Sequence, residues 1–334
     1  MILIKYNNRS KDLKPYFYFA LEKYISEKLL KNDEAFFFLW QIKGVVFGKN
    51  QIIENEINLD FVKKNNINFF RRPTGGGCVY NDPQTPLFSI IAPYKDKHFN
   101  FRKYLGKIIE AFQQLGIKLE FSGRNDILFN GKKVSGNSFI KNKNSVIIHG
   151  TILYDCDIYT MVRCITPSNE KLVSKGISSV TSRVTNLKEY LNGMSQTQLM
   201  RFLENYLTNK TYVLNETENN QVEEMSQVYA SPEWLYFQQP AYSKKLKQKF
   251  EWGILEILLF LKQGKIEKMI LNGDFFHKED NLESFTSYFK DVWYNKENLQ
   301  KILNRVNIND YILNANNKDF LNLLETGILF RSEE

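Results

Sequence analysis

The stretch RRPTGGGCVYND, residues 71–82, places three consecutive glycines after one strand-like segment and before another. Glycine lets backbone N–H groups converge on an anion, because no side chain blocks the approach. Arg71 and Arg72 add charges that can pair with a phosphate or a carboxylate. A glycine triplet alone is more often a flexible turn, and this one matches neither the Walker phosphate loop nor the GxGxxG dinucleotide motif. A second motif is therefore needed to indicate a binding site.

The stretch SGRNDILFNGKKVSGNS, residues 122–138, combines Asn125 and Asp126 with Lys133. A lysine fixed between two strands can bring one positive charge to a carboxylate and a phosphate together, which suits formation of an acyl-adenylate. That reaction depends mainly on alignment and charge neutralisation, since the carboxylate is already a nucleophile. Lys133 is therefore the predicted catalytic residue, against the ordinary alternative of a solvated surface lysine.

Apolar patterning predicts an α+β fold with a mixed sheet in the first two-thirds of the chain. Residues 15–30 and 101–116 have apolar residues at three-to-four spacing, which predicts helices with one stripe against the sheet. Asn130-Gly131 is the dipeptide that a two-residue hairpin turn prefers. Short β-rich runs predict strands at 35–42, 45–48, 87–94, 126–129 and 145–154.

The last third changes character and predicts a second, smaller domain. Ser195 with Gln198 resembles a capping box that opens a helix at 196–207, and Ser231-Pro232 resembles another helix start. The polar residues 211–230 predict a surface segment that leads toward a boundary. A ββααα pattern follows, with a hairpin at 250–261 and 265–275 around Gln263-Gly264 and helices at 281–290, 296–304 and 317–326. The predicted domains are residues 1–245 and residues 246–334.

Composition bounds the function classes without choosing one. The 334 residues fit a large domain plus a small one, and the net charge of +8 favours an acidic partner. The N-terminus lacks a long apolar core, and no run approaches the ~18 apolar residues that span a bilayer, so we expect a cytoplasmic protein. Cys78, Cys156 and Cys164 form no CxxC pair, which argues against a disulfide framework or a zinc cluster.

Together with HGTILYD (149–155) and KLVSKGISSVTSRVTNL (171–187), the two motifs above resemble the lipoate–protein ligase A family over essentially the whole chain. The resemblance implies a mixed-sheet catalytic domain of the biotin/lipoate ligase type followed by a small α+β accessory domain. It implies activation of lipoate by ATP and Mg²⁺ to lipoyl-AMP, and transfer to a lysine of an acceptor. The implied acceptors are lipoyl domains of 2-oxo acid dehydrogenase complexes or the glycine cleavage H protein. We expect a monomer that binds neither nucleic acid nor membranes.

The resemblance also implies roles for individual positions. Asp126 would meet the magnesium, and the segment from Lys171 to Arg183 resembles a loop that closes over the adenylate. The implied contacts to ATP or lipoyl-AMP come from Arg72, Gly77, Cys78, Val79, Tyr80, Asn125, Asp126, Lys133, Lys175 and Arg183. The implied contacts to lipoate come from Gly75, Gly76, Lys133, Ser135, Gly136, His149 and Gly150. Trp40 and Phe47 either line an apolar slot for the lipoate tail or pack in the core.

Two positions depart from the family pattern, and three other functions compete with the ligase. Asn81 stands where the family usually has histidine, and PEWLYFQQPAYS (232–243) stands where the family has a tryptophan-rich segment. An octanoyl or lipoyl transferase would use Cys156 or Cys164 as a nucleophile and need no ATP. A biotin ligase would carry a GRGRxG-like stretch, which is missing, and a nucleic-acid-binding module would leave the glycine triplet unexplained.

Overall fold

The chain folds into two compact units, Met1–Ser231 and Pro232–Glu334. The computed structural model describes residues 1–6, 13–30, 34–94, 102–122, 125–165, 183–237, 240–278 and 282–328. The boundary predicted after residue 245 would fall inside β12 (Tyr242–Phe250). Because β12 pairs along its length with β13 (Gly253–Lys262), the whole strand belongs to the second unit.

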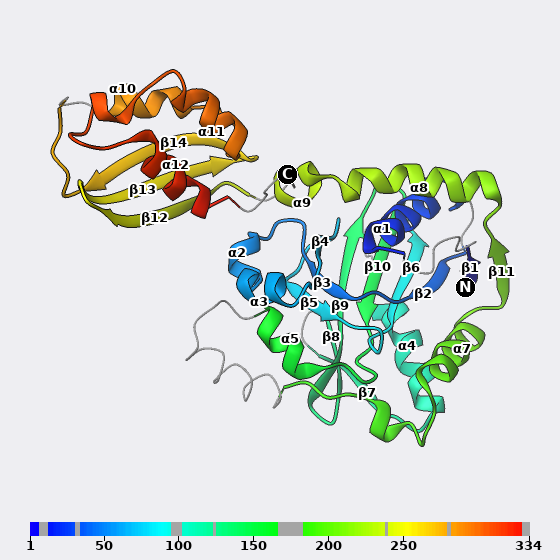
Figure 1. Ribbon diagram of the computed structural model, residues 1–334. Coiled ribbons are helices and arrows are strands. Elements are labelled where there is room, and N and C mark those ends of the chain that lie inside the picture. The colour runs from blue at the N-terminus through cyan, green and yellow to red at the C-terminus, as the bar shows by residue number, and fades with distance from the viewer. Residues whose placement is uncertain are drawn as a thin grey trace. The chain divides into compact units, whose positions relative to one another are not determined.

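An eight-stranded mixed sheet forms the centre of the first unit, in the order β11-β1-β2-β6-β10-β9-β8-β7 (Figure 1). Strand β1 runs parallel to both of its neighbours, and the other pairs are antiparallel. The predicted α+β class with a mixed sheet is confirmed. The strands are β1 (Ile2–Lys5), β2 (Phe36–Trp40), β6 (Leu87–Pro93), β7 (Leu119–Ser122), β8 (Asp126–Phe129), β9 (Lys132–Lys141), β10 (Ser145–Thr151) and β11 (Lys210–Val213).

Successive side chains of β2 point to opposite faces of the sheet, so the strand contributes residues to two cores, one on each face. Phe36, Phe38 and Trp40 pack with α1 (Pro15–Tyr24). Phe37 and Leu39 join the opposite core. The helices of that second core are α4 (Arg102–Gln114) and α7 (Gln196–Leu207). The helices predicted at 15–30 and 101–116 are thereby confirmed, with a π-helical turn at Ile25–Leu29 ending the first one.

The segment predicted as polar surface between 211 and 230 instead forms β11 and α8 (Glu216–Ala230). Asn215 and Glu218 make a capping box that starts the helix, and Val222 is buried in the core beneath α1. Figure 1 shows α8 lying along α1. The sequence did not reveal this helix because its buried residues are Asn219, Val222 and Ser226, of which only Val222 is apolar, so its buried face is not an apolar stripe.

A second, three-stranded sheet holds the glycine triplet. Its order is β4-β3-β5, with β3 (Gly44–Phe47), β4 (Phe69–Arg71) and β5 (Cys78–Asn81). The triplet is the connection between β4 and β5, which both pair with β3. The short helices of this region are α2 (Ile53–Glu56), α3 (Leu59–Lys64) and α5 (Ile158–Ile165), and α5 contacts both β5 and α3.

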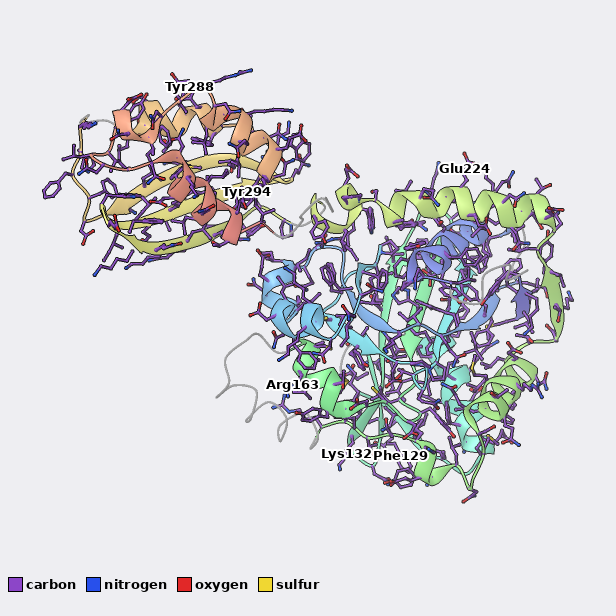
Figure 2. The ribbon with its side chains drawn as sticks, in the orientation of Figure 1. Phe129, Lys132, Arg163, Glu224, Tyr288 and Tyr294 are labelled. Atoms are coloured by element: carbon purple, nitrogen blue, oxygen red, sulfur yellow. The ribbon has the colours of Figure 1, made fainter. Side chains whose placement is uncertain are left out.

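The second motif forms the hairpin β8–β9, as predicted. Asn130 and Gly131 have φ angles of 49° and 74°, which the two-residue turn requires. Phe129 and Lys132 are paired at the tip of this hairpin (Figure 2). The pairing register shifts between Ile127 and Leu128, so β9 carries an extra residue there.

The second unit packs α10, α11 and α12 on one face of a three-stranded sheet, β12-β13-β14, where β14 is Lys265–Gly273. The hairpin around Gln263 and Gly264 is confirmed, with φ angles of 48° and 77°. The predicted ββααα pattern lacked β12, because YSKKLKQKF places only Leu246 in the core. The helices are α10 (Glu283–Thr286), α11 (Lys296–Leu303) and α12 (Asn317–Thr326), and α9 (Pro232–Phe237) precedes the sheet. Among the described helices, none has the length and apolar composition that a membrane crossing requires.

Candidate active site

Arg72 shapes the glycine loop from beneath. Its side chain is buried, with 5% of the residue exposed. Nη2 donates to the carbonyl oxygens of Gly75 (2.7 Å) and Gly77 (2.8 Å), Nε donates to Thr74 Oγ1 (3.0 Å), and Nη1 donates to the Val46 carbonyl (3.1 Å). Burial lowers the pKa of Arg72 to about 10, opposed by the nearby Cys78 and Glu56. The guanidinium therefore holds loop carbonyls, and the adenylate contact implied for it stays a prediction.

The remaining hydrogen bonds of the loop also go to its carbonyl oxygens. Ser138 Oγ donates to Gly75 O (2.8 Å), and Gln51 Nε2 donates to Gly76 O (3.2 Å). Gly48 N donates to Gly77 O (3.2 Å). Within the described part of the chain, the amides of Gly76 and Gly77 donate no hydrogen bond. With its carbonyls held by the protein, the loop can offer these N–H groups to an anion.

Lys133 is aimed by its hairpin. Its Nζ lies 2.8 Å from Asp126 Oδ1, and each side chain is 36% exposed. The end of the side chain lies over Gly136, where an added Cβ would come within 2.9 Å of Cε and Nζ. Lys133 N donates to Arg183 O (2.7 Å), and Thr185 N donates to Lys133 O (3.1 Å). Arg183 thus contributes through its backbone, while its side chain is exposed.

The glycine loop and Lys133 border the same cavity, of about 150 Å³. Part of its wall is apolar and comes from Phe19, Trp40, Val46, Val79 and Leu87. Trp40 thus takes the predicted position. Phe47 does not, because alternation along β3 turns Val46 toward the cavity and Phe47 away, beneath the Arg71 guanidinium at 4.6 Å.

The structure brings most of the predicted site residues to this cavity. Those that border it are Arg72, Gly76, Gly77, Cys78, Val79, Asn125, Lys133, Gly136, His149 and Gly150. Gly75, Tyr80, Asp126, Ser135 and Arg183 do not border it. Tyr80 alternates with Val79 along β5 and is buried on the other face, and Ser135 Oγ donates to Asn137 Oδ1 (3.2 Å). Lys175 lies outside the described residues.

If Asp126 binds magnesium, as predicted, the protein supplies few of the ligands of the ion. In the described ranges, no group of three or more His, Cys, Asp or Glu side chains could hold a metal ion. Asp126 itself is engaged by Lys133. Mg²⁺ is commonly bound by one or two carboxylates together with substrate phosphates, and that arrangement fits this site.

The comparison with family models matches residues 14–208 to the lipoyl protein ligase A/B catalytic domain and residues 239–324 to the bacterial lipoate protein ligase C-terminus. The chain belongs to the lipoate–protein ligase family. Lipoate–protein ligase LplJ of Bacillus subtilis is 32% identical over 91% of this chain and 95% of its own. Lipoate–protein ligase 1 of Staphylococcus aureus is 33% identical, over 77% and 80%.

Solved structures of the lipoate–protein ligase family share the fold. The ligase LipL1 of P. falciparum, in complex with lipoate, has a TM-score of 0.60 at 23% identity and covers 98% of this chain and 99% of its own. A lipoate–protein ligase A bound with ATP gives 0.59 at 21%, over 70% and 96%. The bipartite ligase of Thermoplasma acidophilum, described with its E2 lipoyl domain, gives 0.63 at 22%, over 70% and 95%.

The thiols of this member of the lipoate–protein ligase family are poor nucleophiles. Cys156 and Cys164 are buried, and burial raises the pKa of each to about 12. Burial also raises the pKa of Cys78 well above its usual value. A protonated, inaccessible thiol does not suit the thioester chemistry of the competing transferase.

Sequence reasoning missed four polar residues around this ligase site. Thr74 and Asn137 lie inside the quoted motifs but drew no separate role, and Thr151 Oγ1 accepts from the Gly136 amide (3.2 Å). Glu22 lies on α1 and is fully buried. A charge on the apolar stripe of the predicted helix 15–30 was the available signal, because a buried charge needs partners.

Proposed function

We propose that this protein activates lipoate with ATP and transfers the lipoyl group to a lysine of an acceptor protein. One observation carries the proposal: Gly76, Gly77 and Lys133 border one cavity, and part of the wall of that cavity is apolar. An apolar tail, a carboxylate and a phosphate can thus be bound side by side. Membership in the lipoate–protein ligase family supports the same reaction.

In the first step, a lipoate carboxylate oxygen attacks the α-phosphorus of ATP, and pyrophosphate leaves with the electrons of the broken P–O bond. Lys133 neutralises charge on the carboxylate and the phosphate, and the loop amides stabilise the developing charge. Asp126 holds Lys133 in place and is the proposed protein contact to Mg²⁺, which neutralises the ATP phosphates.

In the second step, the neutral ε-amine of an acceptor lysine attacks the acyl carbon of lipoyl-AMP. The new amide bond forms, AMP leaves, and the amine loses its proton to solvent. The proposed acceptors are lipoyl domains of 2-oxo acid dehydrogenase complexes or the glycine cleavage H protein. An acidic acceptor surface would be steered toward a protein with a net charge of +8. We propose that the ligase acts as a monomer in the cytoplasm.

The decisive experiment is intact-mass spectrometry of a lipoyl domain incubated with the protein, lipoate and magnesium, with and without ATP. We expect one lipoyl group to be added only when ATP is present. Transfer from a lipoyl thioester without ATP would favour the transferase, and no product in any arm would contradict both. Octanoate and biotin in parallel arms test the choice of acyl group.

A further inference from the structure

The buried carboxylate of Glu22 is the end point of two hydrogen-bond chains. Its Oε1 accepts from Ser89 Oγ (2.6 Å) and lies 3.1 Å from His149 Nδ1. Its Oε2 has no hydrogen-bond partner among the described residues. Such a carboxylate is costly to bury, so the groups that converge on it are expected to be held firmly.

The first chain leads from the glycine loop. Arg72 Nε donates to Thr74 Oγ1 (3.0 Å), which lies 2.8 Å from His149 Nε2. The Thr74 hydroxyl can accept from Arg72 and donate to Nε2, while the opposite ring nitrogen, Nδ1, faces Glu22 Oε1. The chain thus links the Arg72 guanidinium to the Glu22 carboxylate through Thr74 and His149.

The second chain leads from the cavity wall. Trp40 Nε1 donates to Ser89 Oγ (2.9 Å), and Ser89 donates to Glu22. Trp40 and His149 both border the cavity, and His149 also belongs to the first chain. One buried carboxylate therefore connects the wall of the acyl pocket with the loop that offers the anion site.

We propose that Glu22, His149 and Thr74 form a positioning relay that tightens the glycine loop when an acyl chain fills the cavity. The inference rests on the function proposed above. An acyl chain against His149 would lower the local dielectric, which strengthens the bonds of its ring nitrogens to Thr74 and Glu22. A more firmly held Thr74 hydroxyl in turn fixes the Arg72 side chain, which donates to the Gly75 and Gly77 carbonyls.

The test measures binding of a non-hydrolysable ATP analogue with magnesium, by calorimetry, with and without saturating lipoate. In the wild-type protein we expect lipoate to tighten analogue binding by about tenfold, within the usual range of such coupling. Thr74→Val and His149→Phe should reduce this factor to near one. Thr74→Ser, which keeps the hydroxyl, should retain it. Ser89→Ala removes the link to Trp40 and one donor to Glu22 but leaves the contacts from Arg72 through Thr74 and His149 to Glu22 in place; it is the control, with most of the factor retained.

Amide hydrogen exchange of Gly48 and Lys49 in the ligand-free protein gives a second measurement, because these amides donate to the loop carbonyls of Gly77 and Thr74. Thr74→Val and His149→Phe should speed this loop exchange, whereas Thr74→Ser and Ser89→Ala should not. Wild-type coupling near one, full coupling in Thr74→Val, or unchanged loop exchange in both broken variants would each overturn the relay. Failure of the proposed function is seen separately, as no lipoate binding and no lipoyl-AMP in the wild-type protein; the loop exchange still tests the relay in that case.

Discussion

Three features of the β8–β9 hairpin set the position of Lys133. The register shift in β8–β9 sets it opposite Leu128, Asp126 binds its ammonium, and Gly136 leaves room for the end of the side chain. Re-aiming one side chain is a common role of such bulges. Because the Lys133–Asp126 ion pair is partly exposed, it positions the ammonium and adds little to the stability of the fold.

Lys133→Ala is predicted to reduce lipoyl-AMP formation by at least about 100-fold, because it removes the charge that neutralises carboxylate and phosphate together. Stability should change by less than about 0.5 kcal/mol, as for other partly exposed positions. Pyrophosphate exchange in the presence of lipoate measures the first quantity and urea unfolding the second. Full adenylation by the alanine variant would remove Lys133 from the mechanism.

Gly136→Ala is predicted to slow adenylate formation about tenfold or more without unfolding the protein. The new Cβ displaces the flexible end of Lys133, which costs little stability but moves the ammonium. Gly106→Ala in α4 is the matched control, because nothing lies within 4 Å of its added Cβ. There we expect a gain of about 0.5–1 kcal/mol and unchanged kinetics. Equal rates in the two variants would contradict the steric argument.

The raised pKa values of Cys156 and Cys164 predict a loss of stability at high pH. In the unfolded chain these thiols ionise near pH 9.0, whereas in the folded protein they ionise near pH 12. Between these values the unfolded state binds fewer protons, so the free energy of unfolding falls as pH rises. Urea unfolding between pH 8 and 11 tests this, and Cys→Ala at both positions should flatten the slope. The same double variant should keep its ATP-dependent activity, unlike a thioester-forming transferase.

At the scale of elements, the capping box of α7 is a local sequence signal that was predicted and is present in the structure. Ser195 Oγ accepts from the Gln198 amide, and the Gln198 side chain accepts from the Ser195 amide. The helix that follows buries Leu199, Leu203 and Leu207 in the core behind the sheet. A weakened cap therefore acts on the core as well as on the helix end.

Ser195→Ala is predicted to destabilise the first unit by about 1 kcal/mol, because the amide at the third helical position loses its acceptor. Ser195→Asp retains an acceptor and should cost little. Guanidinium unfolding followed by circular dichroism measures both. An alanine variant as stable as wild type would mean that water or another group replaces the cap.

At the scale of the whole molecule, each unit has its own apolar core. The first is built on both faces of the eight-stranded sheet, and the second between the β12-β13-β14 sheet and its helices. Separate cores are the condition for independent folding.

We therefore predict that residues 1–231 and 232–334, expressed separately, each unfold cooperatively on heating. Their melting temperatures should match two transitions of the full chain in calorimetry. A fragment that is molten or aggregated, while the full chain melts in one step, would show that the units depend on each other.

The sequence by itself determined the α+β class, both hairpins, the main helices and the two motifs that border the cavity. These follow from short-range signals, since apolar periodicity, Asn130-Gly131 and the Ser195 capping box act within a few residues. Strand β12 and helix α8 escaped prediction because their burial depends on partners distant in sequence.

Only the tertiary structure decided which polar groups serve the site. Arg72 has the residue type of a phosphate ligand, and the fold brings three backbone carbonyls and the Thr74 hydroxyl to its donors, which no local pattern indicated. Glu22 meets His149 and Ser89 across more than 60 residues of chain. Hydrogen bonds of this kind are set by three-dimensional distance, which no local pattern records. Residue type therefore predicted the chemistry, and packing assigned each residue its part in it.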